Sequence, residues 1–284
     1  MIDSSYSDEM VNLAMASEIQ QRLEFAREMN TAAARLILSH YQTGDLTVDS
    51  KSDDSPVTVA DRGAEQLMRQ MLAERFPSDG ILGEEFDDVV SGNGFRWILD
   101  PIDGTKAFIH GIPLFGTLIG VEYQGRMVAG VCGLPALKEV VYAAEGGGCW
   151  WQIGETAPRR VSVTAQQDLS RSRLMITEPS AWKGCGRSEV LNGLMDQVRL
   201  ARGWGDCCGH VLVATGRAEI AADPMMSAWD IAALIPILRE AGGYCLDWRG
   251  DESVVGGDGV SVNAALKDQV IAILRTAPPL PSIK

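Results

Sequence analysis

Apolar residues recur at helical spacing in two early segments of the chain and predict two helices. The first spans about residues 8–41, which are rich in Ala, Leu, Met and Glu, and the second spans 61–76. Pro77 and the turn at Asp79-Gly80 close the second helix, because proline cannot donate the next helical hydrogen bond. A third, short helix is expected from Gly104 to Gly111.

Shorter apolar runs predict strands between and after these helices. They lie at about 80–84, 95–99, 114–123, 127–134 and 139–144. Short turns at Gln124-Gly125 and Pro135-Ala136 separate the last three runs, and such turns join antiparallel neighbours. We therefore expect an antiparallel meander in this part of the chain.

The pattern changes near residues 145–160, which are rich in glycine, and strands then alternate with helices. The strands are expected near 160–163 and 173–177, and the helices near 186–197, 207–216, 227–241 and 264–276. Pro236 should kink the helix at 227–241 or loosen one of its turns.

Acidic residues stand where the predicted strand at 95–99 ends. Asp100 follows it directly, and Asp103 comes one tight turn later, before Gly104 and Thr105. Two carboxylates this close repel each other, and a divalent cation such as Mg²⁺, Mn²⁺ or Ca²⁺ removes that cost. Gly104 allows backbone N–H groups to approach an anion, and a helix beginning there directs its positive end at that anion. This segment indicates metal-assisted attack on a phosphate.

Each acidic segment also has a simpler interpretation. Asp-Pro-x-Asp-Gly alone is equally typical of a turn. Asp230, which opens the apolar run 231–238, is alone typical of a first-turn acid favoured by the helix dipole. Glu84 and Glu85, however, stand at the end of another predicted strand, after the apolar pair Ile81-Leu82. Three acidic ends in one chain favour the metal site.

Composition limits the classes of function. The chain has 284 residues, of which 46% are hydrophobic, so it can form one large domain or two packed subdomains. Its formal net charge of −13 argues against nucleic acid as a partner and against docking on anionic membranes. No apolar stretch reaches the roughly 18 residues of a membrane span.

The cysteines and the start of the chain favour a cytoplasmic location. The six cysteines show no Cys-x-x-Cys spacing, and a chain of this size does not need disulfides, so we expect reduced thiols. The first residues contain neither the basic nor the apolar segment of a signal peptide.

Three segments together resemble the inositol monophosphatase-like family of metal-dependent phosphatases. They are Gly83-Glu84-Glu85, Asp100-Pro101-Ile102-Asp103-Gly104-Thr105 and Trp229-Asp230, in the family's order and approximate spacing. Upstream, Lys51 and residues 56–61 resemble the family's loop before its second helix, and the resemblance covers about residues 15–275. Residues 106–109, 113–119 and 203–210 are most similar to the histidinol-phosphate phosphatase branch.

The resemblance implies a sugar-phosphatase-type fold, an α+β and α/β layered sandwich with alternating helix and sheet layers. It divides the chain into an N-terminal α+β half (1–150), carrying most metal ligands, and a C-terminal α/β half (151–284), carrying the last ligand and the substrate-side residues. The change near 145–160 agrees with that division. Because relatives are commonly dimers, a homodimer is also implied.

The same resemblance assigns the metal site. The implied ligands of two or three Mg²⁺ ions, for which Mn²⁺ can substitute, are Glu84, Asp100, the Ile102 carbonyl, Asp103 and Asp230. Such ions polarise phosphoryl oxygens and lower the pKa of a bound water.

It further implies the groups around the phosphate. Thr105 and Asp61, with Glu84 as a catalytic metal ligand, orient and deprotonate the attacking water. The N–H groups of Gly104 and Thr105, beside Asp103, hold the phosphate. Asp61 alone, however, is also typical of a helix N-cap.

Substrate-side residues are assigned less directly. Asp223 faces the substrate alcohol in the family, and Asp206 and His210 are candidates for the same pocket, although Asp206 is also a typical N-cap. Lys51 lies near a metal site or in a flap, or is a solvated surface lysine. Trp182 is a candidate lid or a packing residue.

The implied activity is a Mg²⁺-dependent phosphomonoesterase acting on a small phosphorylated metabolite, most closely histidinol phosphate, in histidine biosynthesis. One alternative is an inositol-1-phosphate or related sugar or nucleotide phosphatase. An alternative of another class is an inactive relative that binds a metal or a partner. The presence of all four carboxylates with Thr105 and Asp61 argues against the inactive relative.

Overall fold

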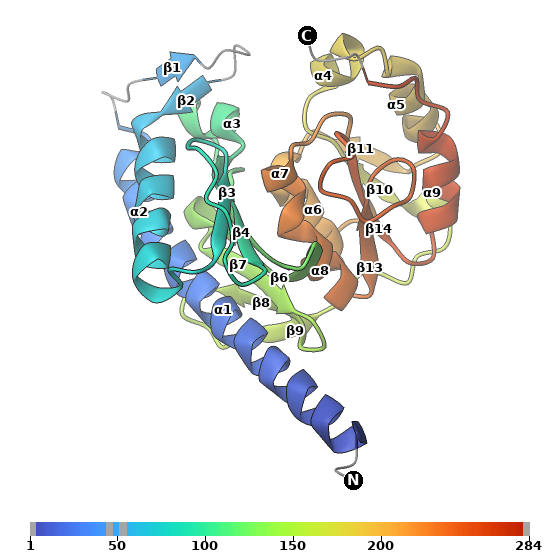
Figure 1. Ribbon diagram of the computed structural model, residues 1–284. Helices are drawn as coiled ribbons and strands as arrows, with labels where there is room; N and C mark the ends of the chain where they lie inside the picture. Colours follow the sequence, from blue (N-terminus) through green and yellow to red (C-terminus); the bar gives the residue numbers. More distant parts are fainter. Residues whose placement is uncertain (1–3, 44–47, 51–55, 281–284) are drawn as a thin grey trace.

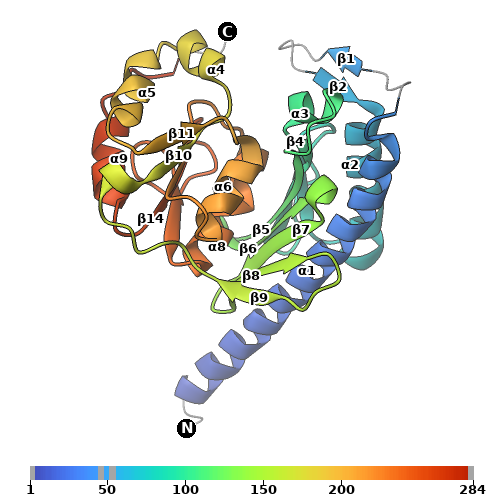
Figure 2. The same ribbon diagram turned by 180° about the vertical axis from the view of Figure 1, so that it is seen from behind.

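The computed structural model describes residues 4–43, 48–50 and 56–280 of the chain. Helices and sheets alternate in five layers, which Figures 1 and 2 show from opposite sides. The order is helices, a seven-stranded sheet, helices, a five-stranded sheet and helices. This arrangement confirms the predicted layered α+β and α/β sandwich. Lys51 lies outside the described residues.

Two long helices cover the outer face of the first sheet. They are α1 (Ser4–His40) and α2 (Val59–Arg75). Ala60, Ala64, Met68 and Leu72 are buried on α2 at spacings of four residues, which places one apolar stripe against the sheet. A two-stranded ribbon, β1 (Val48–Ser50) and β2 (Pro56–Thr58), precedes α2.

The first sheet has the strand order β3-β4-β5-β6-β7-β8-β9. Its strands are β3 (Gly80–Gly83), β4 (Phe95–Asp103), β5 (Gly116–Tyr123), β6 (Arg126–Leu134), β7 (Glu139–Ala144), β8 (Gly148–Ile153) and β9 (Arg159–Val161). Only β3 and β4 pair in parallel, and the rest form an antiparallel meander, as predicted. The short helices α3 (Thr105–Ile109) and η1 (Pro135–Leu137) lie in its connections.

The glycine-rich segment near 145–160 forms part of this sheet. Gly146 and Gly148, with φ of 73° and 75°, turn the chain between β7 and β8. The first sheet therefore continues to Val161, eleven residues beyond the expected division at residues 150 and 151. The division into two halves with separate roles remains a proposal.

The second sheet has the order β11-β10-β12-β14-β13, in which β10 pairs in parallel with β11 and β12, and β14 pairs antiparallel with β12 and β13. Its strands are β10 (Arg173–Met175), β11 (Leu200–Arg202), β12 (Ile220–Asp223), β13 (Gly243–Leu246) and β14 (Gly259–Asn263). The surrounding helices are η2 (Leu169–Arg171), α4 (Pro179–Gly184), α5 (Ser188–Met195), α6 (Asp206–Ala214), α7 (Ala228–Ala232), α8 (Leu234–Glu240) and α9 (Lys267–Leu274).

Helices α6, α7 and α8 form the central layer between the two sheets (Figure 1). The predicted helix at 227–241 is two helices, α7 and α8, which meet at Ala233. Pro236 has no N–H to donate to the carbonyl of Ala232, so the helix is interrupted one turn before the proline. The interruption leaves α7 as a short segment that carries Asp230.

Apolar side chains fill the spaces between the layers in three clusters. The six cysteines are all buried as free thiols, as expected, at Cys132, Cys149, Cys185, Cys207, Cys208 and Cys245. Among the described helices, none combines the length and the apolar character that crossing a bilayer requires.

Candidate active site

Three carboxylates from two distant segments meet at the end of β4. Asp100, Asp103 and Asp230 each offer an oxygen, and these atoms all lie within 4.8 Å of one another. The pairing of β4 with β5 is interrupted between Asp100 and Asp103, so the strand bends there and brings both residues to one side. Asp230 is held by the capping box of α7, in which its Oδ2 accepts the Ser227 N–H at 2.6 Å.

The carboxylates disfavour one another's charge. Burial raises the pKa of Asp100 well above its usual value, and the charges of Glu84, Asp103 and Asp230 raise it further. Burial also raises the pKa of Asp103, with added repulsion from Asp206 and Asp230. Such a cluster is unstable as free anions, which is the condition that a cation relieves.

The donor set fits a hard divalent cation. Oδ1 of Asp100 is buried without a hydrogen-bond partner in the described structure. Carboxylate oxygens in this number and proximity suit Mg²⁺ or Mn²⁺. Glu84, at the end of β3, is close enough to affect the pKa of Asp100 and extends the acidic site.

Thr105 and Asp61 lie together beside this cluster. The Thr105 hydroxyl lies 3.0 Å from the Ile102 carbonyl oxygen and 3.4 Å from Oδ1 of Asp61. Asp61 is not the N-cap of α2 but its third residue, and its Oδ2 accepts from both the N–H and the hydroxyl of Thr58 at 2.8 and 2.5 Å. Burial raises the pKa of Asp61, so this carboxylate takes up a proton more readily than an exposed one.

The turn after β4 lies in the wall of the site and leads directly into α3. Gly104 has φ of 84°, a conformation that glycine adopts without strain, and α3 begins at Thr105. From the other half of the chain, the Cys207 N–H donates to Oδ2 of Asp103. The first turn of α6 is thereby fixed against the acidic cluster.

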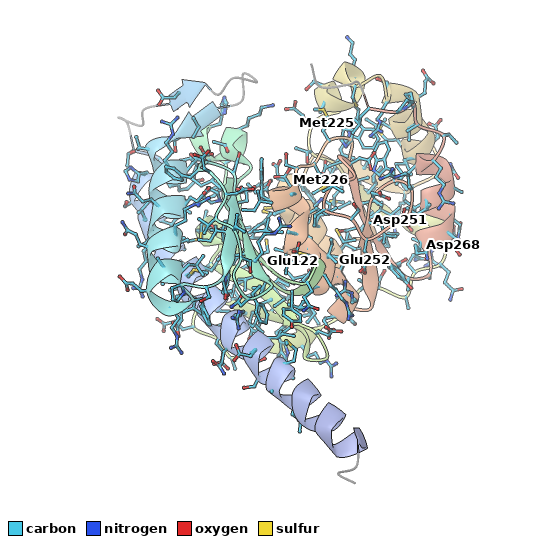
Figure 3. All side chains as sticks on the ribbon, in the orientation of Figure 1. Glu122, Met225, Met226, Asp251, Glu252 and Asp268 are labelled. Atoms are coloured by element: carbon cyan, nitrogen blue, oxygen red, sulfur yellow. The ribbon has the colours of Figure 1, made fainter. Side chains whose placement is uncertain are left out.

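A pocket of about 390 Å³ opens over the cluster, between the two sheets' loops. Its walls come from the residue after β3, from the loop after β4 and from three segments of the C-terminal half. They include Glu84, Asp103, Gly104, Thr105, Lys106, Thr177, Glu178, Asp206, Cys207, Asp223 and Asp230. Met225 and Met226, labelled in Figure 3, add an apolar part to the wall.

Asp206 and Asp223 face this pocket from the C-terminal half. The Asp206 N–H donates to the Thr177 hydroxyl at 2.9 Å, and the Thr177 N–H donates to Oδ1 of Asp223 at 3.1 Å. Burial raises the pKa of Asp206 to about 7, with repulsion from Asp223 and Asp230 adding to the rise. Asp206 is the first residue of α6, with φ of 50°, whereas the N-cap position expected as its alternative role belongs to Gly205.

The structure places His210 away from the pocket and decides between the two roles expected for Trp182. His210 does not line the pocket, because its fully buried imidazole lies behind Asp223, 3.1 Å from Oδ2 of that carboxylate. Trp182 is fully buried against Trp248, with ring centroids 5.1 Å apart. Trp182 therefore packs α4 onto the core, as its alternative interpretation held, and is not an exposed lid.

Sequence reasoning missed several residues of the wall. Glu178 and Lys106 form an ion pair of 3.0 Å that joins α4 to α3 across the pocket. Thr177 connects Asp206 with Asp223, and the Cys207 N–H reaches Asp103. These contacts join segments far apart in the chain, so no local pattern marks them.

Comparison with known proteins agrees with this geometry. The model of the inositol monophosphatase family matches residues 18–278, and the chain belongs to this family of phosphatases. A histidinol-phosphatase of Chlorobaculum parvum is 47% identical over 89% of this chain and 96% of its own length. A histidinol-phosphatase of Mycobacterium tuberculosis is 40% identical over 81% and 88%.

The fold has a close counterpart among solved structures. The extragenic suppressor protein SuhB of Bartonella henselae superimposes with a TM-score of 0.82 at 28% identity, over 90% of this chain and 98% of that one. Nearly the whole described chain therefore forms one family fold.

Proposed function

We propose that this chain is a Mg²⁺-dependent phosphomonoesterase that hydrolyses L-histidinol phosphate to L-histidinol and phosphate. The observation that carries the proposal is the pair of carboxylates, Asp206 and Asp223, that faces the same pocket as the metal-site acids. Histidinol phosphate carries an ammonium group, which can donate charge-assisted hydrogen bonds to these acids. The similarity to two histidinol-phosphatases supports the same substrate.

In this proposal Glu84, Asp100, Asp103, Asp230 and the Ile102 carbonyl hold two or three Mg²⁺ ions, for which Mn²⁺ substitutes. When bound, the metal polarises the phosphate and makes a nearby water more acidic. The clustering of Asp100, Asp103 and Asp230 within 4.8 Å supports this assignment.

The remaining residues position the reactants. The N–H groups of Gly104 and Thr105, beside Asp103, orient the phosphate. The Thr105 hydroxyl accepts from the attacking water and donates to Asp61, whose raised pKa suits it to receive the water's proton. The water oxygen bonds to phosphorus as the phosphorus–oxygen bond to the alcohol breaks, and the leaving alkoxide takes up a proton.

The test compares kcat/KM for histidinol phosphate and inositol 1-phosphate in the wild type, Asp206→Asn and Asp223→Asn. A charge-assisted hydrogen bond is worth roughly 1.5–3 kcal/mol, so each variant should lose about 10- to 100-fold on histidinol phosphate and less on inositol phosphate. Equal losses on both substrates, or a wild type that prefers inositol phosphate, would leave only the broader phosphatase activity. Full activity after chelation with EDTA would refute the metal mechanism.

Two further features belong to the proposal. We expect a homodimer, as the family resemblance implies, and a cytoplasmic location, as the reduced thiols imply. Light scattering of the purified protein measures the first, and fractionation of the source cells measures the second.

A further inference from the structure

His210 has no direct contact with the pocket, yet both of its ring nitrogens have partners. Its Nδ1 lies 2.7 Å from the Ser261 hydroxyl oxygen and its Nε2 lies 3.1 Å from Oδ2 of Asp223. The side chains of His210 and Ser261 are fully buried, whereas Asp223 reaches the pocket wall. The three side chains thus form a row that leads from the protein interior to the pocket.

The fold places this row on one face of the second sheet. Ser261 on β14 pairs with Ala221 on β12, and Asp223 lies two residues further along β12. Residues two apart on a strand share a face, so Ser261 and Asp223 both face α6, which carries His210. Ser261, a polar residue in the middle of the buried strand β14, therefore has its hydrogen-bond partner, His210, on α6.

The donor and the acceptor in each hydrogen bond of this row follow from the groups at its two ends. An ionised Asp223 carboxylate can only accept, so the imidazole donates from Nε2, and a neutral ring then accepts the Ser261 hydroxyl proton at Nδ1. Oδ1 of Asp223 accepts the Thr177 N–H at 3.1 Å. Both carboxylate oxygens are thus anchored, which fixes the plane of the carboxylate before substrate binds.

Serine, histidine and aspartate in a row also form the nucleophilic triad of many hydrolases. Here the order is reversed with respect to the pocket, because the serine is fully buried and the aspartate is at the pocket wall. Ser261 cannot reach a substrate, so covalent catalysis does not explain the row.

We propose that His210 is a positioning residue for substrate selection, which holds Asp223 oriented to receive the cationic group of the leaving alcohol. This inference rests on the proposed function, in which Asp223 contacts the substrate ammonium. A fixed carboxylate gives more affinity than a mobile one, because less orientational freedom is lost on binding. His210 therefore acts on the KM of a cationic substrate more than on kcat.

Two buried amides provide a matched pair of variants. In His210→Gln the amide nitrogen takes the place of Nε2 and still reaches Asp223. In His210→Asn the amide nitrogen takes the place of Nδ1, so the contact with Asp223 is lost. Both variants replace an aromatic ring by a flexible amide, and melting temperatures verify that both fold.

Steady-state kinetics in Mg²⁺ then separate positioning from packing. We expect His210→Asn to raise the KM for histidinol phosphate about 10-fold, of the order of one misaligned charge-assisted hydrogen bond, with kcat within about 3-fold. His210→Gln should stay within about 3-fold of the wild type. The phosphate ester of imidazolylpropanol, which lacks the amino group, should show no such difference between the two variants. Equal effects of the two variants, or equal effects on both esters, would overturn the positioning role.

An independent measurement needs no substrate. The chain has only three histidines, so ¹⁵N NMR of the imidazoles identifies His210 by the signal that His210→Gln removes. We expect the tautomer protonated at Nε2, and one protonated at Nδ1 would overturn the inference. If the wild type does not hydrolyse histidinol phosphate, the proposed function fails, and the tautomer still decides the arrangement of His210.

Discussion

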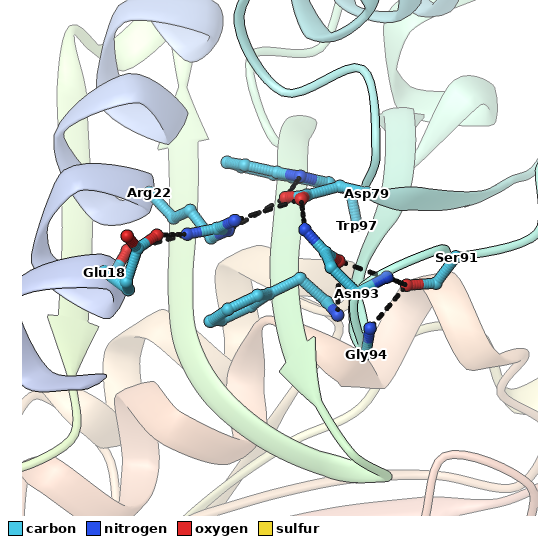
Figure 4. A network of polar contacts seen from close by, with 8 residues as sticks. Glu18, Arg22, Asp79, Ser91, Asn93, Gly94 and Trp97 are labelled. Carbon is cyan, nitrogen blue, oxygen red and sulfur yellow. Dashed lines mark hydrogen bonds and ion pairs between the residues drawn. The ribbon is translucent and has the colours of Figure 1, made fainter. Parts of the chain in front are cut away.

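Arg22 and Asp79 form a bidentate ion pair that connects α1 to the turn before β3. Nε of Arg22 lies 2.8 Å from Oδ2 of Asp79, and Nη2 lies 3.0 Å from Oδ1, with both side chains nearly inaccessible. Figure 4 shows that Asp79 also accepts from the Trp97 ring and the Asn93 amide, at 2.8 and 2.7 Å. The Asp79 carboxylate thus connects α1 to the beginnings of β3 and β4, the two strands at whose far ends Glu84, Asp100 and Asp103 lie.

Removal of this carboxylate should destabilise the fold strongly. Asp79→Ala leaves Nε and Nη2 of the buried Arg22 and the buried ring N–H of Trp97 without their acceptor, which costs about 3–5 kcal/mol. We expect the melting temperature to fall by about 6 °C or more. The control is Glu18→Ala, because Glu18 contacts the same Arg22 at 2.6 Å but is 48% exposed. That change should cost less than about 1 kcal/mol. Similar losses in the two variants would show that the buried pair is not a major source of stability.

Asp103→Asn and Asp230→Asn should each reduce activity at least ~100-fold, because each removes a charged ligand worth several kcal/mol to the transition state. The fold should persist in both. The amide oxygen can still accept the Cys207 N–H or the Ser227 N–H, and one repelling charge is gone. Turnover in Mg²⁺ and melting curves in EDTA measure the two effects. If the metal-free variants melt far below the metal-free wild type, these residues are structural and not metal ligands.

Stability without metal should fall as the pH rises. Asp100 and Asp103 have pKa values raised well above the usual value, and that of Asp206 is raised to about 7. A carboxyl group with a raised folded-state pKa binds more protons folded than unfolded, so stability is lost from about pH 4 upward to the folded-state pKa. In EDTA we expect the melting temperature to drop by at least about 4 °C between pH 5.5 and 8.

The same titration in Mg²⁺ provides the control. Because the cation binds the ionised carboxylates, the stability that Mg²⁺ adds to the metal-free protein should increase from pH 5.5 to 8. A metal-free protein whose stability is constant from pH 5.5 to 8 would contradict the raised pKa values.

Local signals in the sequence were sufficient for the elements around the metal site. The apolar run before Asp100, the turn residues after it and the first-turn position of Asp230 all act within a few residues. The structure has the turn and the first-turn acid where the patterns predict, but β4 continues through Asp100 to Asp103 instead of ending at residue 99. The α2 helix was expected at 61–76 and begins two residues earlier, because the capping residue is Thr58 and not Asp61.

The substrate side depends on contacts that no local pattern contains. In β14, polar Ser261 and Asn263 alternate with apolar residues, a pattern typical of a strand with one exposed face. The strand is nevertheless buried on both faces. Ser261 is buried because His210, fifty-one residues earlier, is its partner. Likewise, only the packing of Thr177 between Asp206 and Asp223 explains how the two acids come to share one pocket.

Gly205, the N-cap of α6, packs against the backbone of Thr177. A Cβ at Gly205 would overlap the backbone of Thr177, whereas a Cβ at Gly203 would lie 3.6 Å from the Thr177 carbonyl oxygen, an ordinary contact. Gly205→Ala must therefore displace Thr177, whose N–H and hydroxyl contact Asp223 and Asp206. We expect kcat/KM for histidinol phosphate to fall at least ~10-fold, since Asp206 and Asp223, the two acids proposed to accept from the substrate ammonium, are then misplaced. Gly203→Ala should remain within about 2-fold of the wild type, because surface substitutions of this kind have small effects. A Gly205→Ala enzyme with normal kinetics would mean that the spacing between Thr177 and α6 does not set the positions of the two acids.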